Sequence, residues 1–548
     1  MNSLMINATV WGGPECVPES GWVHLKDTRI ADTGPGDPPP HLTEGVDRII
    51  DLTGKHVLPG FVDVHTHVSA SAWLPSAGDA ADWTSLRHCL AQIRRDAACA
   101  DAGEWLLYLN ADPYGWSDEA RLPRADELDE AAGGRPVVIA CIDLHRGAVS
   151  SEVLSGLGAV TSSLLHPEDV VRGRRGAATG ELYEAAFSAA IAMAQRSIAE
   201  RLGDEGINRL LDREAGRHLD HGITHAHDPG VAPDAADALA ELAGRTPLRL
   251  SWAAAPATGL LAPAPEAGQM APGAYGIAPA EVKIFTDGAD RCAVRLPPAA
   301  ALRMVVDTMR AAARKRSLSP FSGTGTMRLA DGHFSTSSAL RYDDAELERV
   351  LSDHARAGHR VRIHALGNLA VDQVTRTVRR VGMAADSVTI EHLTLLSQAD
   401  AAALAAVGAW ASFQPGFLSG YAKKMTDTGI HQHLAVLGGR RLLDAGNRLI
   451  LSSDQPCGPL DPLHNIRCAV QRLDGNNGAI QAEQALTVQE AVKASTTTAA
   501  ASLFSPAAAG ITAGAPADLA ILNSHPVDDR CRVLSTWVGG EERAATAR

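Results

Sequence analysis

Eight short apolar runs rich in β-branched residues recur along the middle of the chain, and a helical spacing of apolar residues follows most of them. The runs occupy residues 56–67, 222–228, 248–255, 281–287, 360–365, 387–392, 409–414 and 448–454. The helical patterns include residues 234–243, 344–357, 370–381, 398–407 and 433–445. Strands that alternate with helices are typical of a parallel sheet, and eight such units close into a (β/α)₈ barrel. The sequence therefore predicts an α/β fold of the TIM-barrel type.

Two segments between the runs are irregular. Residues 70–215 are far too long for a single crossover, so we predict an insertion after the first barrel strand that covers the barrel mouth. Within it, helices are expected near residues 79–99 and 182–201, and a strand at residues 136–143. Residues 256–279, rich in Ala, Pro and Gly, show no clear helix and are the least regular part of the predicted barrel.

The two chain ends share a pattern of short strands interrupted by Gly and Pro. Strands are expected at residues 4–11, 21–30, 47–52, 517–522 and 533–538. Each end is too short to form a core of its own. We therefore predict that residues 1–56 and 505–548 pair as a small composite β-sandwich, and that residues 57–504 form the barrel with its insertion.

Composition and charge narrow the class of partner. The 548 residues, 45% hydrophobic and 21% charged, fit a globular protein of enzyme size. A net charge of -14 repels nucleic-acid phosphates and anionic membranes, so neither is an expected partner. The eight cysteines form no CxxC pair, which favours a reducing cytoplasm over a disulfide framework. With no signal-peptide pattern and no apolar stretch of about 18 residues, we expect a cytoplasmic protein that acts on a small molecule. The sequence leaves open whether the protein forms a homo-oligomer.

Histidines end three of the predicted barrel strands. His65 and His67 close the first run at positions i and i+2, so their side chains lie on one face of a strand and can meet one cation, a geometry that suits zinc, iron or manganese. His364 and His392 close the fifth and sixth runs. Since the carboxyl ends of barrel strands share one rim, the four histidines are expected to converge on a divalent metal, with zinc as the first choice and one or two ions. The alternative is four unrelated structural histidines among 21 in the chain.

Two further polar residues lie in these runs. Asp454 closes the eighth run, and a carboxylate there can ligate the metal and carry a proton from water to a leaving amine. Its alternative role is to cap the next helix. Lys283 lies within the apolar fourth run, and an ammonium group cannot ligate a cation. Residue chemistry alone leaves Lys283 unassigned.

In this arrangement the residues resemble the amidohydrolase superfamily, and within it amidohydrolase family 3, the branch of YtcJ-like proteins and N-substituted formamide deformylases. The resemblance covers nearly the whole chain. In chain order the motifs are Asp63-Val64-His65-Thr66-His67, Asp143-Leu144-His145, Thr179-Gly180-Glu181-Leu182, Gly222-Ile223-Thr224-His225, Val282-Lys283-Ile284-Phe285, His364-Ala365-Leu366-Gly367, Ile390-Glu391-His392, Gln414-Pro415, Ser453-Asp454 and Gly514-Ala515-Pro516-Ala517-Asp518-Leu519.

The resemblance implies roles that the pattern of residues does not settle. It implies a (β/α)₈ barrel with a composite β-sandwich, four histidine ligands, a catalytic Asp454, and a carbamylated Lys283 that bridges metals. His145 in the insertion, Arg291 and Gln414 are expected to contact the substrate. The candidates for each role are then metal ligands His65, His67, Lys283, His364, His392 and Asp454; catalytic groups Asp454 and His392; and, for support of the ligands, His225 and His227.

The chain also departs from the family pattern at two places. Asn368 stands where the family often has Asp, which removes a charge from that position. Residues 289–295 replace a stretch rich in glycine and serine, so the substrate loop is expected to differ.

These observations favour hydrolysis of a non-peptide carbon–nitrogen bond in an amide, formamide or N-acyl group. Water activated by the metal attacks the carbonyl, the metal and a histidine stabilise the oxyanion, and Asp454 moves the proton. One alternative is hydrolytic deamination of a ring amidine, which releases ammonia. A second is a catalytically silent binding protein of the same fold, against which the complete ligand set stands.

Overall fold

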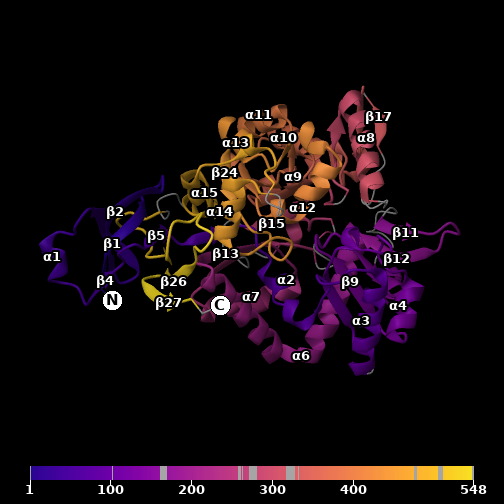
Figure 1. Cartoon of the computed structure of the whole chain (residues 1–548), viewed down its shortest axis with the longest axis horizontal. Coiled ribbons are helices and arrows are strands. Elements are labelled where there is room, and N and C mark those ends of the chain that lie inside the picture. Colours follow the sequence, from indigo (N-terminus) through magenta and orange to yellow (C-terminus); the bar gives the residue numbers. More distant parts are fainter. Residues whose placement is uncertain are drawn as a thin grey trace.

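The structure is a computed structural model, and it describes residues 2–101, 103–160, 169–256, 261, 263–270, 280–289, 291–315, 327–330, 332–473, 478–503 and 510–545. Figure 1 shows three regions: a sheet built from both chain ends, a central barrel with its helices, and an insertion that contains β9 (Val137–Cys141). No helix of the described residues is long and apolar enough to cross a membrane. The prediction for residues 256–279 falls largely outside the described residues.

All eight predicted barrel runs contain a strand, which confirms the (β/α)₈-type fold. The strands are β6 (Phe61–Asp63), β13 (Ile223–Val231), β14 (Arg249–Ala254), β15 (Glu281–Phe285), β19 (Arg360–Ala365), β20 (Val388–His392), β22 (Trp410–Phe413) and β24 (Arg448–Leu451). They pair in parallel in this order. Beyond the last strand, the Asp454 N–H donates to the His65 carbonyl at 2.7 Å, and the Ser453 N–H donates to Asp63 Oδ1 at 3.1 Å. These two bonds bring the first and last strands together.

Helices follow most of the barrel strands, largely where the apolar spacing predicts them. They are α7 (Pro233–Arg245), α8 (Pro298–Lys315), α9 (Asp344–Arg356), α10 (Asn368–Val381), α11 (Gln398–Val407), α12 (Phe417–Asp427), α13 (Gly439–Asp444), α14 (Pro462–Gln471), α15 (Val488–Ser495) and α16 (Thr497–Leu503). The helix predicted at residues 433–445 is wrong in its first half. There β23 (Ala435–Val436) pairs with β21 (Leu395–Leu396), and the helix begins only after Gly438. Two successive glycines favour such a break because they disfavour a helix interior.

The first predicted run is divided between two sheets. β5 (His56–Pro59) belongs to the sheet of the chain ends, whereas β6 belongs to the barrel. The division falls at Gly60, where a Cβ atom would lie 2.3 Å from the Thr224 side chain. Only glycine permits this close approach, so the chain turns from one sheet into the other at that residue.

The chain ends form one mixed sheet. It contains β1 (Asn2–Gly12), β2 (Val17–Lys26), β3 (Arg29–Pro35), β4 (Arg48–Asp51), β5, β25 (Leu519–Leu522), β26 (Val533–Val538) and β27 (Glu541–Ala544). The expected pairing of the two ends occurs where β5 runs antiparallel to β25, with Leu58 opposite Ala520. Met5, Val57 and Trp537 lie in its buried core. The domain limits at residues 56 and 505 stay a prediction, and residue 505 lies outside the described residues.

The insertion forms a sheet of its own with helices on both faces. Its strands are β7 (Gly78–Asp79), β8 (Leu106–Ala111), β9 (Val137–Cys141), β10 (Arg146–Val149), β11 (Val170–Arg172) and β12 (Ala178–Tyr183). One apolar core includes residues of α3 (Leu86–Cys99) and α4 (Ala125–Ala132). Another includes residues of α5 (Ser151–Val160) and α6 (Glu184–Asp220). After a break at Gly203, α6 leads back to β13 and the barrel.

Candidate metal centre

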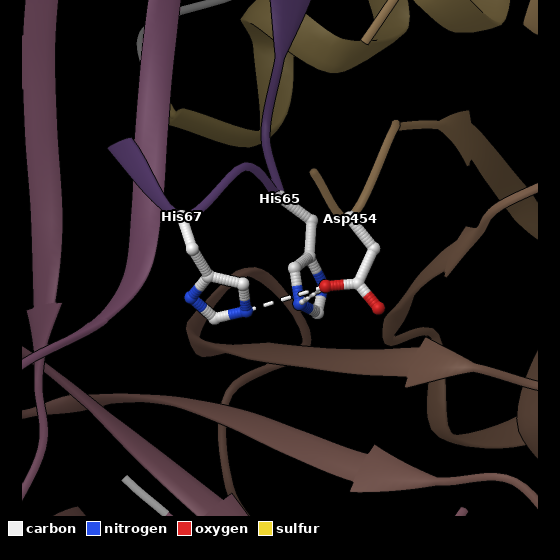
Figure 2. Close-up of side chains that lie close together, drawn as sticks. All are labelled: His65, His67 and Asp454. Atoms are coloured by element: carbon white, nitrogen blue, oxygen red, sulfur yellow. Dashed lines mark ion pairs between the residues drawn. The ribbon is translucent and has the colours of Figure 1, made fainter. Parts of the chain in front are cut away.

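His65, His67 and Asp454 come together where the first and last barrel strands end. His65 and His67 follow β6, and Asp454 follows β24. Figure 2 shows both imidazole rings beside the carboxylate: Asp454 Oδ1 lies 3.3 Å from His65 Nε2 and 3.2 Å from His67 Nε2. One ligand atom from each residue lies within 4.8 Å of the others, and all three residues are buried. Two imidazole nitrogens and a carboxylate oxygen at this separation fit a cation such as zinc.

His364 and His392 border this group. Their ring centroids lie 4.4 Å apart, and the His392 ring lies 4.9 Å from that of His65. Both ring nitrogens of His364 are buried without a hydrogen bond, which is costly unless another partner occupies the space. His392 Nδ1 lies 2.9 Å from Gln414 Oε1, so Nδ1–H donates and the other ring nitrogen keeps its lone pair. Both histidines therefore fit a metal-ligating role.

The backbone at the centre adopts an uncommon conformation. His392 has a φ of 73° and Asp454 a φ of 54°, in the left-handed region that few residues other than glycine adopt. Such outliers gather at functional sites, where the surrounding structure enforces them. Here the Asp454 N–H group donates a hydrogen bond to the His65 carbonyl at 2.7 Å, and this bond holds the Asp454 carboxylate next to the His65 ring.

Lys283 lies on β15 beside the three residues. Its Nζ atom is 3.4 Å from His65 Nε2, and the side chain is fully buried. Burial lowers the pKa of Lys283 to about 8, although Glu391 and Asp454 act in the opposite direction. The amine therefore loses its proton far more readily than an exposed lysine does.

Charges around the centre favour an ionised carboxylate. Burial would raise the pKa of Asp454, but His65 and His67 outweigh it and hold that pKa well below its usual range. Burial also opposes charge on His67, yet Asp228 and Asp454 raise its pKa to about 9. Burial lowers the pKa of His392 to about 3, which keeps its ring neutral. Without a cation, the proton on His67 balances part of the carboxylate charge.

A buried ion network beneath the histidines is a feature that the sequence pattern did not reveal. Glu391 Oε2 lies 2.8 Å from His65 Nδ1. Arg362 bonds Glu391 through its Nη1 group at 2.5 Å and Glu281 through Nε at 3.0 Å. None of the three charged side chains has any exposed surface. Arg360, Arg362 and His364 alternate along β19, so all three point into the barrel.

The other histidines lie near a carboxylate or a hydroxyl group as well. Asp228 Oδ1 lies 3.5 Å from His67 Nδ1, and Asp287 Oδ1 lies 3.6 Å from His364 Nε2. His225 and His227 both contact Ser251 Oγ at 2.9 Å. The role of these two histidines in supporting the ligands stays a prediction. In the sequence, the only feature that could have pointed to a role of Asp228 and Asp287 at the centre is their position at the ends of predicted strands.

The three predicted substrate contacts have different surroundings. His145 lines the cavities at the centre, and its ring lies 5.3 Å from that of His364. Gln414 is fully buried and bonds His392 and Ser452, and it is absent from the described lining of both cavities. We therefore propose that Gln414 positions His392 and does not contact substrate. The Arg291 guanidinium lies 3.7 Å from the Tyr183 ring centroid, and its substrate role stays a prediction.

Replacing Arg362 tests the buried ion network. In Arg362→Met, Glu281 and Glu391 lose a buried partner, so we expect unfolding in guanidinium chloride to show a loss of about 3–5 kcal/mol. Arg349→Met, at an exposed side chain of α9, is the control and should change stability by less than about 0.5 kcal/mol. Adding Glu281→Gln and Glu391→Gln to Arg362→Met should restore part of the loss. Equal stability of the two single arginine variants would contradict the network.

Metal uptake is expected to depend on pH. A protonated imidazole cannot ligate, so His67, with a pKa of about 9, must release its proton when a cation binds. The apparent affinity of metal-free protein for Zn²⁺ should therefore rise by up to about tenfold per pH unit from pH 6 toward pH 9. Isothermal titration in buffers of different ionisation enthalpy measures the released protons. Affinity that stays constant over this range, with no proton release, would contradict the assignment of His67 as a ligand.

Comparisons with known proteins bear on the family and the fold of this chain. The chain matches the profile of the Amidohydrolase family over residues 48–544. It is 27% identical over 513 residues to N-substituted formamide deformylase from Arthrobacter pascens, and the aligned region covers 90% of this chain and 89% of that protein. It is 23% identical over 507 residues to the putative amidohydrolase YtcJ from Bacillus subtilis, and the aligned region covers 87% of this chain and 85% of that protein.

A solved structure shares the whole architecture. An uncharacterized metal-dependent hydrolase from Pyrococcus horikoshii aligns with a TM-score of 0.66 at 20% sequence identity, over 99% of this chain and 100% of that one. This likeness shows a common fold. The family profile spans nearly the entire sequence, and this chain therefore belongs to the amidohydrolase family and is a hydrolase of carbon–nitrogen bonds other than peptide bonds.

Proposed function

We propose that the protein hydrolyses the amide bond of an N-acyl or N-formyl amine with a divalent cation held by His65, His67 and Asp454. The observation that carries the proposal is the meeting of these three ligands at the cavity that His364 and His392 also line. Nitrogen and oxygen ligands of this kind favour zinc. When bound, the cation lowers the pKa of water and polarises the substrate carbonyl. His364 and His392 complete the donor set.

Lys283 is proposed as a further ligand after it is carbamylated. Addition of carbon dioxide to its neutral amine forms an N–C bond and releases a proton, and the product is a carboxylate. The lowered pKa of Lys283, about 8, favours the neutral amine that this step needs. Its position 3.4 Å from His65 Nε2 would direct the new carboxylate toward the same ligand group.

Asp454 is proposed to move the proton. Its Oδ1 atom faces His65 and His67, while Oδ2 lies 3.8 Å from His392 Nδ1. Because its pKa is held well below the usual range by the two histidines, the carboxylate is ionised and can accept a proton from water. The deprotonated water oxygen adds to the carbonyl carbon. Asp454 then donates the proton to the nitrogen of the leaving amine, so that the C–N bond breaks and an amine and a carboxylic acid form.

His145 is proposed to stabilise the carbonyl oxygen in place of His392. The hydrogen bond from His392 to Gln414 leaves no N–H on the other ring nitrogen of His392. His145 Nδ1, in contrast, lies 2.7 Å from Glu184 Oε2, and this carboxylate raises the pKa of His145 despite its burial. A protonated His145 keeps an N–H for the developing oxyanion. In this proposal His145 is the histidine that stabilises the oxyanion, and His392 ligates the cation.

Asp454→Asn tests the proton transfer. The amide oxygen can still ligate, but the side chain can no longer accept a proton, so kcat should fall by about 10²–10⁴-fold while metal content is retained. Elemental analysis of the same preparation separates the two effects. Wild-type turnover in the metal-loaded variant would overturn the role.

The reaction class is tested with a panel of N-formyl and N-acyl amines on the zinc-loaded protein. Release of a primary amine together with a carboxylic acid supports amide hydrolysis. Release of ammonia from ring amidines, without hydrolysis of any amide, would replace the proposal with deamination.

A further inference from the structure

Two cavities meet at the candidate metal centre. The first, here called the α12 cavity, has a volume of about 190 Å³ and is lined by α12 together with Met304 and Ile430. The second, called the α6 cavity, has a volume of about 340 Å³ and is lined by α6, α7 and strand β8 of the insertion. The residues that line both cavities are Asp143, His145, His364, His392, Asp454 and Cys457. The proposed reacting groups therefore lie on the boundary between the two cavities.

The α12 cavity has an apolar wall that begins at the centre itself. The Phe417 ring is parallel to the His392 ring at 6.4 Å, and the Tyr421 ring meets Phe417 edge-on at 5.3 Å. Met304 and Met425 add flexible apolar side chains. Away from the shared residues, Lys424 is the one charged side chain in the described lining of this cavity.

The α6 cavity is apolar over most of its lining as well. Trp73, Leu107 and Ile191 come from the segment between the first and second barrel strands, and Leu239 comes from α7. Away from the metal centre, Arg196 is the one charged side chain in the described lining, and it is exposed. Both sides of the centre therefore offer apolar surface to a bound molecule.

We propose that the substrate carries an apolar group on each side of the scissile bond, one on the carbonyl carbon and one on the nitrogen. This proposal rests on the proposed amide hydrolysis and names its substrate class. Asp454 lines both cavities, so a scissile bond placed beside it can have one substituent buried in each cavity. An apolar cavity of about 150 Å³ accepts a benzene-sized group. By that measure the α12 cavity takes one ring, and the α6 cavity takes a ring with an attached chain.

A formamide fits this arrangement less well than a larger amide. Its acyl side is a single hydrogen, which leaves one of the two cavities without an apolar occupant. Each methylene that enters an apolar cavity should improve binding by about fourfold. Because of the two cavities, we expect this protein to prefer substrates with an acyl group larger than formyl, unlike an enzyme specific for formyl groups.

Two substrate series on the zinc-loaded protein test the proposal. One varies the acyl group of an N-benzyl amide from formyl to hexanoyl, and the other varies the amine of a benzamide from methyl to hexyl. We expect kcat/KM to rise in both series, by up to about fourfold per methylene, until a cavity is filled. A formyl optimum, or a rise in one series alone, overturns the two-sided substrate and leaves amide hydrolysis intact. Failure to hydrolyse any amide overturns the proposed function itself.

Matched variants assign each cavity to one side of the bond. Ile191 lines only the α6 cavity, and Met425 lines only the α12 cavity. Ile191→Trp should shorten the preferred chain in one series, and Met425→Trp should shorten it in the other, while Ile191→Ala and Met425→Ala should lengthen them. The Ala variants keep the test valid if a Trp variant does not fold. Effects of both positions on the same series, or on neither, would overturn the proposal.

Discussion

The contact between His65 and Glu391 is the interaction on which the rest of the centre depends. Glu391 lies 2.8 Å from His65 Nδ1, which directs the other ring nitrogen, Nε2, toward Asp454. A buried carboxylate is stable only with compensating charge, and Arg362 supplies it from inside the barrel. Through Arg362 the network also includes Glu281 on β15, the strand that carries Lys283. Three strands are therefore tied together below the ligands.

Closure of the barrel completes the arrangement. Asp454 is far from His65 in the sequence, yet its N–H bonds the His65 carbonyl, and Asp63 accepts the N–H groups of both His65 and Ser453. The same backbone that joins the first and last strands therefore sets the distance between carboxylate and imidazole. Metal chemistry at this rim needs such rigid support, because small displacements of ligands weaken both binding and catalysis.

The sequence predicted the strands and the histidines because both depend on local pattern. Apolar runs mark strands buried on both faces, and a polar residue at the end of such a run marks the rim. The partners of these residues could not be predicted in the same way. Arg362 and Glu391 are charged residues inside apolar strands, and their pairing follows from strand neighbours that the sequence does not specify. The role of Gln414 likewise depends on where His392 lies.

Errors in the prediction also have physical causes. The prediction of a helix over the whole of residues 433–445 is wrong because the apolar spacing of these residues does not reveal that β23 pairs with β21. The first run contains two strands in place of the one that its pattern predicts, because its apolar character continues through Gly60, where the chain passes from one sheet to another. In both cases tertiary pairing overrides the local pattern.

The most direct test of the metal centre is an X-ray structure of the zinc-loaded protein with an anomalous difference map at the zinc edge. We predict an anomalous peak within bonding distance, about 2.0–2.2 Å, of ring nitrogens of His65 and His67 and of an Asp454 oxygen. A zinc-loaded crystal with no peak between these residues, or with its peak elsewhere in the molecule, would contradict this centre.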